Sequence, residues 1–459
     1  MAENINALDF GKNFFWGVSS SAPQTEGAYN VEGRGPSIWD EFALRPGKII
    51  NDERPNTACN FYENYKKDIL LLKQLGIPNF RMSFSWSRIF PQGTGKINPH
   101  GINFYHEVLN TCIENGIEPW ITLYHWDLPL ALEKKGGWTN REIINWFSEY
   151  VEFCVKEFGT KIKYWIVLNE PVVFTGAGYF LGAHAPGRRG LKNFLPAVHH
   201  AAMCQALGFR IIKKINPRAK VGTTFSCSHI TPNSKSFLDL KAADRVDALL
   251  NRLFIEPSLG LGYPIKTLPY LKKINNYILE GDMDLVHVHF DFIGIQNYTR
   301  EVVKHSFYTP YIFAKLIPAD KRKVFYTQMD WEVYPKGIYY MLKRFSEYKH
   351  VKDLIITENG ASFPDTVING EINDEDRKNY IASYLTEVLK AKKENIPVKG
   401  YFVWSFTDNF EWGEGYKQRF GLVYVDYATQ KRTVKKSGLW YSKFIREARY
   451  HELEEEALI

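Results

Sequence analysis

The chain has 459 residues, of which 45% are hydrophobic, 24% charged and 15% aromatic. The first two proportions are ordinary for a water-soluble globular protein. Its net charge of +7 is spread over short clusters such as 321–323 and 435–436. Because no basic block accompanies a nucleic-acid-binding motif, we do not expect a nucleic-acid partner.

The cysteines and the N-terminal sequence bear on the compartment. The five cysteines are scattered, odd in number and never arranged as C-x-x-C, which argues against a disulfide framework or a zinc site. The first residues lack the basic and apolar segments of a signal peptide. No apolar run approaches the roughly 20 residues that span a bilayer. We therefore expect a cytoplasmic protein without a membrane partner; the sequence does not indicate an oligomeric state.

Strand-like apolar runs recur along the whole chain. They lie at 14–20, 79–86, 118–125, 164–170, 220–227, 291–298, 353–360 and 399–406. Amphipathic helical patterns lie between several of them, at 65–76, 101–116, 141–159 and 377–394. Nearly all-apolar strands that alternate with helices are typical of a parallel sheet covered by helices. Eight such units predict an α/β fold, a closed (β/α)₈ TIM barrel, and the absence of any linker predicts a single domain over residues 1–459.

Two of the predicted strands end beside a glutamate. One run leads into Asn169-Glu170-Pro171, and the other leads into Glu358-Asn359-Gly360. A carboxylate at the end of a buried strand is costly to desolvate. In such a barrel the chemistry lies at the C-terminal strand ends. The sequence therefore predicts that Glu170 and Glu358 take part in two-carboxylate chemistry.

The other strand ends carry aromatic, imidazole and guanidinium groups. They are Arg81, Trp86, His125, Trp126, Tyr298 and Trp404. No glycine-rich phosphate-binding loop accompanies them, and the combination is typical of a carbohydrate site. Each residue taken alone could be an ordinary polar cap on a strand end, but that interpretation explains the whole set poorly.

A series of short motifs, in this order, resembles glycoside hydrolase family 1, the β-glucosidase-type retaining glycosidases, along nearly the whole chain. The motifs are Phe-Trp-Gly at 15–17, Gln-Thr-Glu-Gly at 24–27, the run at 80–89, Tyr-His-Trp-Asp-Leu-Pro at 124–129, Asn-Glu-Pro at 169–171, His-Ala-Pro-Gly at 184–187, Trp-Glu-Val-Tyr-Pro at 331–335, Thr-Glu-Asn-Gly at 357–360 and Asp-Asn-Phe-Glu-Trp at 408–412.

The resemblance implies a double displacement with net retention. Glu358 is then the nucleophile and Glu170 the acid/base, and their carboxyl groups must lie about 5–5.5 Å apart. Arg81 and Tyr298 are expected beside Glu358, where they should lower its pKa and hold it ionised. Burial and the charge of Glu358 should raise the pKa of Glu170.

The resemblance also implies the sugar contacts. Asn169 is expected at the 2-hydroxyl, and the amide, imidazole and carboxyl groups of Gln24, His125 and Glu411 at the 3-, 4- and 6-hydroxyls. The remaining expected contacts are the ring platform Trp404, the donor Trp412, Phe420 around C6, the substrate-binding residues Trp126 and Tyr298, and Trp331 as the wall of the aglycone subsite.

Four positions refine the expected specificity. Glu411 would repel a sugar phosphate, which favours unphosphorylated glycosides, and a glutamate rather than a glutamine at Glu170 favours O-glycosides. Val167 replaces a threonine and Gln296 an asparagine that are usual in the family. Both departures leave the fine geometry and the preference among glucose, galactose and fucose open.

The expected function is an exo-acting, retaining β-glucosidase that needs no metal or other cofactor. Its substrates would be small-molecule glycosides, such as cello-oligosaccharides or aryl glucosides, which suggests a role in cellulose degradation. Activity on β-galactosides, β-fucosides or β-mannosides, and transglycosylation, remain alternatives. An inactive carbohydrate-binding relative is disfavoured because both glutamates are present. A metal-dependent hydrolase is disfavoured because His125 has no strand-end histidine companions.

Overall fold

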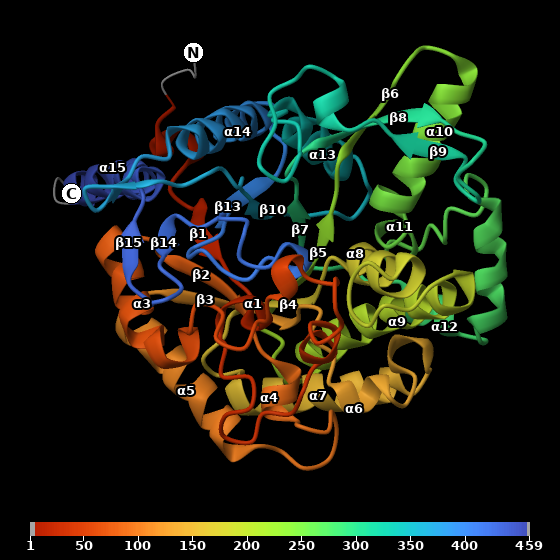
Figure 1. Ribbon diagram of the computed structural model, residues 1–459, viewed down its shortest axis with the longest axis horizontal. Coiled ribbons are helices and arrows are strands. Elements are labelled where there is room, and N and C mark those ends of the chain that lie inside the picture. The colour runs from red at the N-terminus through yellow and green to blue at the C-terminus, as the bar shows by residue number, and fades with distance from the viewer. Residues whose placement is uncertain (1–4, 457–459) are drawn as a thin grey trace.

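The computed structural model describes residues 5–456, with side chains as far as Glu447. Eight parallel strands close into a barrel in the order β1-β13-β10-β7-β5-β4-β3-β2 (Figure 1). They are β1 (Phe15–Ser19), β2 (Asn79–Ser83), β3 (Glu118–Tyr124), β4 (Tyr164–Asn169), β5 (Lys220–Ser226), β7 (Phe292–Gln296), β10 (Leu354–Asn359) and β13 (Val398–Trp404). Each lies within one of the eight predicted runs or differs from it by a residue, so the predicted barrel is confirmed.

Helices surround the barrel on its outside (Figure 1). The longer ones are α3 (Phe61–Leu75), α5 (Pro99–Glu114), α7 (Ile143–Phe158), α9 (Leu191–Ile215), α10 (Phe237–Asp247), α13 (Lys336–Ser346), α14 (Glu375–Lys393) and α15 (Lys436–Glu456). The shorter ones are α1 (Ala22–Thr25), α2 (Ile38–Phe42), α4 (Trp86–Ile89), α6 (Leu130–Glu133), α8 (Pro171–Thr175), α11 (Ile255–Ser258) and α12 (Asp282–Val286).

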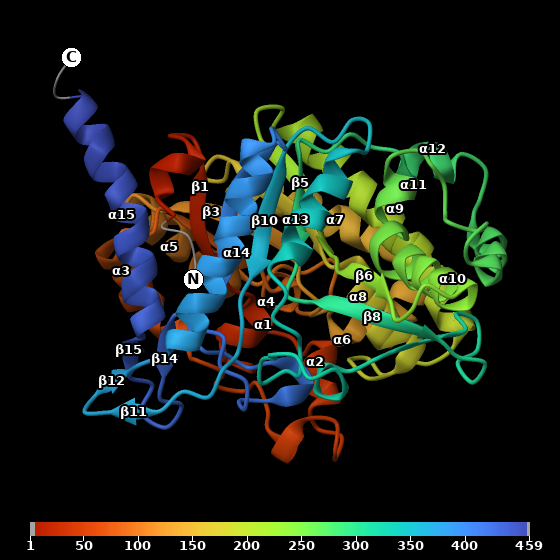
Figure 2. The same ribbon diagram turned by 90° about the horizontal axis from the view of Figure 1, so that it is seen from above.

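Short strands lie outside the barrel and extend its loops. The hairpins β11 (Val367–Ile368) with β12 (Glu371–Ile372) and β14 (Val423–Val425) with β15 (Arg432–Val434) follow β10 and β13. A three-stranded sheet contains β6 (His229–Pro232), β8 (Arg300–His305) and β9 (Ala314–Leu316). Figure 2 shows the two hairpins together at one end of the barrel, beside the loops that carry α1 and α2.

The inside of the barrel is packed with large side chains and is not a pore. The cluster consists of Trp120, Ile166, Phe292, Ile355 and Phe402, each from a different strand. The Trp120 ring also stacks on Tyr164 with 3.9 Å between ring centroids. These residues form a solid floor, as is usual in this fold.

Local sequence explains where several helices begin and end. α3 ends at Leu75 because Gly76 adopts a left-handed conformation with φ 71°, which costs glycine little. α5 begins at Pro99, whose missing N–H is not needed in the first helical turn. One predicted boundary is wrong: β2 ends at Ser83, and Trp86 begins α4. The Trp86 ring stacks on Tyr150 at 4.8 Å, so it packs between barrel and helix.

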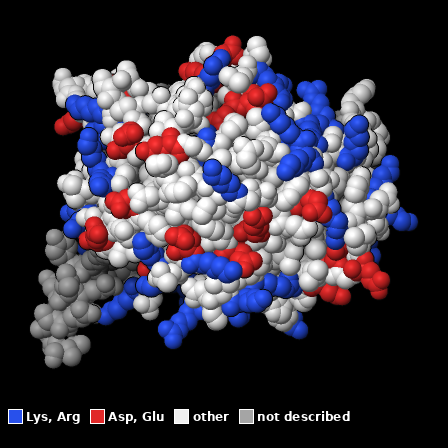
Figure 3. Space-filling model, turned by 90° about the horizontal axis from the view of Figure 1, so that it is seen from below, with Lys and Arg blue, Asp and Glu red and all other residues white. Residues whose placement is uncertain are grey.

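On the face seen in Figure 3, Lys and Arg side chains lie among Asp and Glu side chains. They do not form one continuous basic surface there. Within residues 5–456, no helix has the length and hydropathy needed to cross a bilayer. All five cysteines are buried and free of disulfides.

A buried charge network joins the loops after β10 and β13 to the outer helices. The Lys435 ammonium lies 2.5 Å from Asp365 Oδ2 and 2.7 Å from Asp408 Oδ1. Arg377 also pairs with Asp365, and Arg419 lies 2.6 Å from Asp408. Burial lowers the pKa of Lys435, while the two aspartates oppose that change. Because the pairs are fully desolvated, losing one member leaves buried charge uncompensated.

We expect Lys435→Met to lower the free energy of unfolding by roughly 3–5 kcal/mol, because Asp365 and Asp408 each lose one of their two cationic partners in a buried site. Lys436→Met is the matched control: Lys436 is exposed and its ion pair with Glu375 should contribute less than about 1 kcal/mol. Chemical denaturation of both variants and the wild type measures the difference. Equal stability of the two variants would contradict a structural role for the network.

Candidate active site

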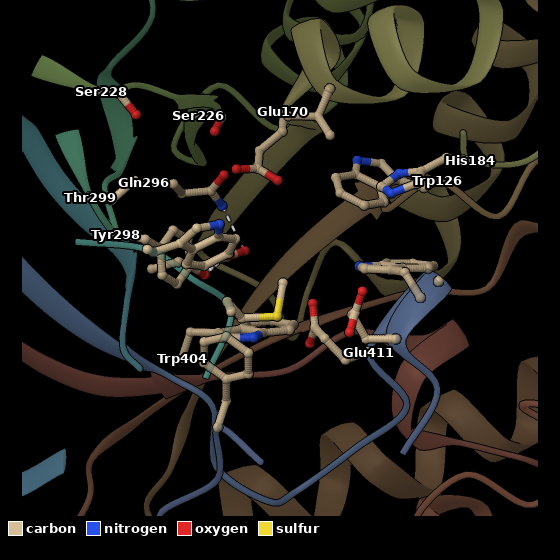
Figure 4. Close-up of a pocket in the computed structure, with 18 of the residues that line it drawn as sticks. Trp126, Glu170, His184, Ser226, Ser228, Gln296, Tyr298, Thr299, Trp404 and Glu411 are labelled. Carbon is tan, nitrogen blue, oxygen red and sulfur yellow. Dashed lines mark hydrogen bonds between the residues drawn. The ribbon is translucent and has the colours of Figure 1, made fainter. Parts of the chain in front are cut away.

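A cavity of about 330 Å³ lies at the C-terminal ends of the barrel strands. Glu170 faces it from one side, and Trp404 and Glu411 face it from the opposite side (Figure 4). Most of the predicted site residues line it, namely Gln24, His125, Trp126, Glu170, Tyr298, Trp331, Glu358, Trp404, Glu411, Trp412 and Phe420. Arg81 and Asn169 do not line the cavity, but both form hydrogen bonds with residues that do.

Irregular strand pairing directs Glu358 toward the cavity. Ile355 belongs to the cluster inside the barrel, so strict alternation along β10 would turn Thr357 inward and Glu358 outward. The pairing of β10 with β7 shifts between Ile356 and Glu358. Such a shift exchanges the faces to which the following side chains point. Glu358 therefore lines the cavity.

A similar shift in β4 separates Val167 from the site. In a regular strand, residues three apart point to opposite faces. Pairing with β5 is shifted between Ile166 and Asn169, and as a result both side chains point into the barrel. Val167 lies on the outer face, against α9: a Cβ added to Gly208 would lie 2.5 Å from Val167 Cγ1. The departure at Val167 thus changes packing behind the strand and removes no hydroxyl from the cavity.

The residues that follow β3 and β4 have unusual backbone conformations. Glu170 has φ 47° and Trp126 has φ 77°, both in the left-handed region. Each such residue costs roughly 1–3 kcal/mol when it is not glycine. The helix α8 begins at Pro171, directly after Glu170. The sharp turn leaves the Glu170 side chain at the cavity instead of within the sheet.

Glu358 is surrounded by hydrogen-bond donors. Its Oε1 pairs with Arg81 and accepts a hydrogen bond from Gln296 Nε2 at 2.6 Å, while Oε2 accepts one from the Tyr298 hydroxyl at 2.6 Å. Burial raises the pKa of Glu358, and Arg81 and Tyr298 oppose that rise. The net direction differs from the expected lowering, because desolvation outweighs the two donors. The donors nevertheless favour the carboxylate over the acid.

Glu170 lies in a different environment. It forms no ion pair with any residue in 5–456; its recorded donors are the Asn169 amide at 3.4 Å and the Ser226 hydroxyl. Burial, and then the negative charge of Glu358, raise the pKa of Glu170 to about 8. At neutral pH Glu170 is therefore an acid, while Glu358 has the contacts that stabilise its ionised form.

The side-chain amide of Asn169 links the catalytic and sugar-binding groups. Its Oδ1 accepts hydrogen bonds from Arg81 at 2.5 Å, Gln296 at 2.8 Å and Thr224 at 3.1 Å, which fixes the orientation of the amide. Its Nδ2 must then donate to His125 Nε2, at 3.1 Å. Burial lowers the pKa of His125 far below its usual value, so the neutral ring carries its proton on Nδ1. That N–H is buried and has no hydrogen-bond partner within the described chain.

Gln24 and Glu411 form a second polar group at the cavity. Gln24 Nε2 donates to Glu411 Oε2 at 3.3 Å, and the Ser21 hydroxyl donates to Gln24 Oε1 at 2.7 Å. Burial and the charge of Glu358 raise the pKa of Glu411 to about 8. These side chains can therefore both donate and accept hydrogen bonds, as ligands of vicinal hydroxyl groups must.

Aromatic rings form the walls between these polar groups. Trp126 packs against Trp412 at 4.6 Å, and its indole N–H donates to the Asn169 backbone oxygen at 3.0 Å. Trp126 thus offers a ligand its ring face only. Trp331 packs against Tyr298 at 5.3 Å and lies in the loop before α13. Trp331 therefore lines the cavity and does not pack at the start of a helix. An aglycone wall is expected to have this position.

Several cavity residues escaped the sequence-based prediction. They are Val173, Ser226, Cys227, Ser228, Thr299, Glu301, Met329, Gly413 and Glu414. One signal was available, because Ser226 and Cys227 are the last two residues of the predicted fifth strand, at the barrel end where the chemistry is expected. Thr299 and Glu301 follow Tyr298 into β8, a strand outside the barrel that has no counterpart among the predicted elements.

The titratable groups of the cavity are carboxyl, imidazole and phenol side chains and the Cys227 thiol. In the described part of the chain, no three His, Cys, Asp or Glu side chains gather in an arrangement that could hold a metal ion. An acid and a hydrogen-bonded carboxylate in one desolvated cavity are the two groups that a double displacement at an anomeric carbon requires.

The chain is similar in sequence and in structure to known beta-glucosidases. The chain is 39% identical over 444 residues to beta-glucosidase A of Thermotoga maritima, which covers 96% of this chain and 99% of that protein. It is also 39% identical to beta-glucosidase A of Acetivibrio thermocellus, over 96% of this chain and 99% of that one. A structure of beta-glucosidase from Thermotoga maritima in complex with glucoimidazole superimposes with a TM-score of 0.92, covering 96% and 99% of the two chains at 39% identity.

The sequence profile of glycosyl hydrolase family 1 matches residues 7–450. This range contains the barrel and every residue that lines the cavity. The chain therefore belongs to glycosyl hydrolase family 1.

Proposed function

We propose that this protein is a retaining, exo-acting β-glucosidase with Glu358 as nucleophile and Glu170 as acid/base. The observation that carries the proposal is the contrast between two buried glutamates on one cavity. Glu358 contacts three donors, Arg81 among them, whereas Glu170 has no cationic partner within residues 5–456. The contrast provides one carboxylate and one acid at neutral pH.

In the proposed reaction, Glu358 attacks the anomeric carbon while Glu170 gives its proton to the departing glycosidic oxygen. The resulting glycosyl-enzyme is hydrolysed by a water molecule that the now ionised Glu170 deprotonates. Loss of the Glu358 negative charge in the intermediate favours the ionised form of Glu170, because the two carboxyl groups no longer repel each other. The same pair can thus serve both steps.

The sugar-binding groups support a terminal glucosyl residue as the substrate. The Gln24–Glu411 pair offers donors and acceptors to hydroxyl groups, and Trp404 offers a flat ring. Among the described residues that line the cavity there is no Lys or Arg to compensate the charge of a phosphorylated sugar. Structures of a Thermotoga maritima relative contain glucoimidazole or deoxynojirimycin. These features favour unphosphorylated glucosides, bound by the non-reducing end.

We further infer that residues 1–459 act as one catalytic domain in the cytoplasm, on small-molecule glycosides released during cellulose degradation. Two observations support this inference. Five buried free cysteines suit a reducing compartment. A relative 38% identical over 95% of this chain is named 1,4-beta-D-glucan glucohydrolase.

Replacement of the nucleophile gives the first test of this function. Glu358→Ala should lower kcat on an aryl β-D-glucoside by roughly four orders of magnitude or more, because the covalent intermediate can no longer form. Added azide should restore turnover and give the α-glucosyl azide, since the small anion attacks from the face that the carboxylate occupied. Product analysis by NMR measures this. Substantial residual hydrolysis without azide would rule out Glu358 as the nucleophile.

The pH dependence tests the acid/base assignment. Glu170 must be protonated in the first step and is protonated below its pKa, so kcat/KM should fall as pH rises through about 8. At low pH, activity should fall again as Glu358 becomes protonated. We expect Glu170→Gln to lack the alkaline limb on an activated aryl glucoside, because the titrating acid is gone.

Glu411→Gln is the control for that experiment, since the pKa of Glu411 is also raised to about 8. The variant should bind sugar less tightly but keep the alkaline limb. If the limb vanishes in Glu411→Gln and persists in Glu170→Gln, the roles assigned to these two glutamates are wrong.

A further inference from the structure

One wall of the cavity is built by two chain segments that leave the barrel side by side. After β5 the chain continues into β6, and after β7 it continues into β8. β6 and β8 pair in parallel, with Ile230 opposite Glu301. Ser226, Cys227 and Ser228 of the first segment and Thr299 and Glu301 of the second line the cavity. Thr299 and Glu301 are two residues apart in an extended segment, so their side chains point to the same face.

Within this wall, Glu301 is a half-buried carboxyl group without a partner. It forms no hydrogen bond or ion pair with any residue in the described range 5–456. Its cationic neighbours bind another acid: Arg300 forms a two-point contact with Glu332 at 2.8 and 2.9 Å, and Arg322 also pairs with Glu332. Burial raises the pKa of Glu301 to about 7. At neutral pH the group can therefore accept and, in part of the molecules, donate a hydrogen bond.

Ser228 lines the same cavity, and its backbone is fixed by a side chain. Asn251 accepts a hydrogen bond from the Ser228 backbone N–H at 3.1 Å and donates one to its carbonyl at 2.9 Å. The hydroxyl has no partner in the described structure, and Figure 4 shows it on the same side of the cavity as Ser226 and Thr299. Fixed polar groups that lack partners are prepared to bind polar groups of a ligand.

The wall lies beyond the catalytic pair. Tyr298 contacts Glu358, and the chain then runs through Thr299 to Glu301 as it leaves the barrel end. Met329 and Trp331 line the cavity as well, and the Trp331 ring packs on Tyr298. A leaving group in this part of the cavity would meet an indole face, a carboxyl group and a hydroxyl. A flat apolar surface beside a few hydrogen-bonding groups suits a second sugar ring better than an aryl or alkyl group.

We propose that Glu301 is a specificity-determining residue that binds hydroxyl groups of a sugar leaving group, with Ser228 as its neighbour and Trp331 as the stacking surface. The inference rests on the proposed function and extends it: the preferred substrates are glucosyl units β-linked to another sugar. An aryl leaving group contacts Trp331 and makes no use of Glu301. Removal of Glu301 should therefore lower activity on substrates with a sugar leaving group and leave activity on aryl glucosides unchanged.

The test compares cellobiose with 4-nitrophenyl β-D-glucoside, which share the glucosyl group and differ in the leaving group. Glu301→Ala should lower kcat/KM on cellobiose at least about tenfold, because a hydrogen bond to a carboxylate is lost in a partly buried site. kcat/KM on the aryl glucoside should stay within about twofold. Glu301→Gln, which keeps an acceptor and a donor, should retain more cellobiose activity than Glu301→Ala.

Glu280→Ala is the matched control, because Glu280 is an exposed carboxylate outside the cavity. This variant should leave kcat/KM unchanged on both substrates. Ser228→Ala should shift the ratio of the two kcat/KM values in the same direction as Glu301→Ala, by a smaller factor. Equal losses on both substrates, or no loss on cellobiose, would overturn the role of Glu301. A wild-type protein inactive on both substrates would instead overturn the proposed function.

Discussion

Two carboxyl groups buried on one small cavity repel each other, and the rest of the site is arranged around that repulsion. Glu358 and Glu170 cannot both be ionised cheaply in a desolvated space. Arg81, Gln296 and Tyr298 all donate to Glu358, so the negative charge is held there. Glu170 receives no comparable support, and the proton stays on it. The protonation states that a double displacement needs thus follow from where the donors are placed.

The donors are themselves fixed by a second set of contacts. Asn169 Oδ1 accepts from Arg81 and Gln296, the same two side chains that hold Glu358. Its Nδ2 orients His125, so the nucleophile, the amide at the expected 2-hydroxyl position and the imidazole form one network. Gln296 is part of that network through two hydrogen bonds of its amide group. Gln296, which stands where asparagine is usual, therefore links Asn169 to the nucleophile Glu358.

The scaffold around this network is rigid. The loop after β10 and the loop after β13, which carries Glu411 and Phe420, are tied to α14 and α15 by desolvated ion pairs around Lys435. Catalytic groups that must keep their geometry within fractions of an ångström need such support from outside the cavity. Placing the ion pairs behind the loops leaves the cavity itself free for substrate.

Much of this arrangement was predictable from the sequence, because it depends on regular features. Apolar runs separated by amphipathic helices predict the barrel, and the strand-end rule places Glu170 and Glu358 at its mouth. The register shifts before Asn169 and Glu358 were not predictable. A sequence shows the alternation of side chains along one strand, but it does not show where the pairing with the neighbouring strand shifts by a residue. α9 was missed although its sequence is as amphipathic as those of α3 and α5, which were predicted, so this helix was within reach of the sequence.

The electrostatics illustrate a different limit. Arg81 and Tyr298 were expected beside Glu358 and are found there, yet the direction of its pKa depends on burial, which has no local sequence signal. The outer wall was missed for a related reason. Ser228 and Glu301 are far apart in the sequence and line the same cavity because the segments that carry them run side by side where β6 pairs with β8. Non-local pairing of this kind leaves no periodic pattern in either segment.

The most direct test of the account is the anomeric configuration of the first product formed, followed by proton NMR during hydrolysis of an aryl β-D-glucoside. If Glu358 attacks the sugar and Glu170 then activates water on the opposite face, which the leaving group has vacated, β-D-glucose should appear first and convert to the α-anomer only by slow mutarotation. Initial release of α-D-glucose would mean that water attacks directly, and would contradict the assignment of Glu358 as a nucleophile.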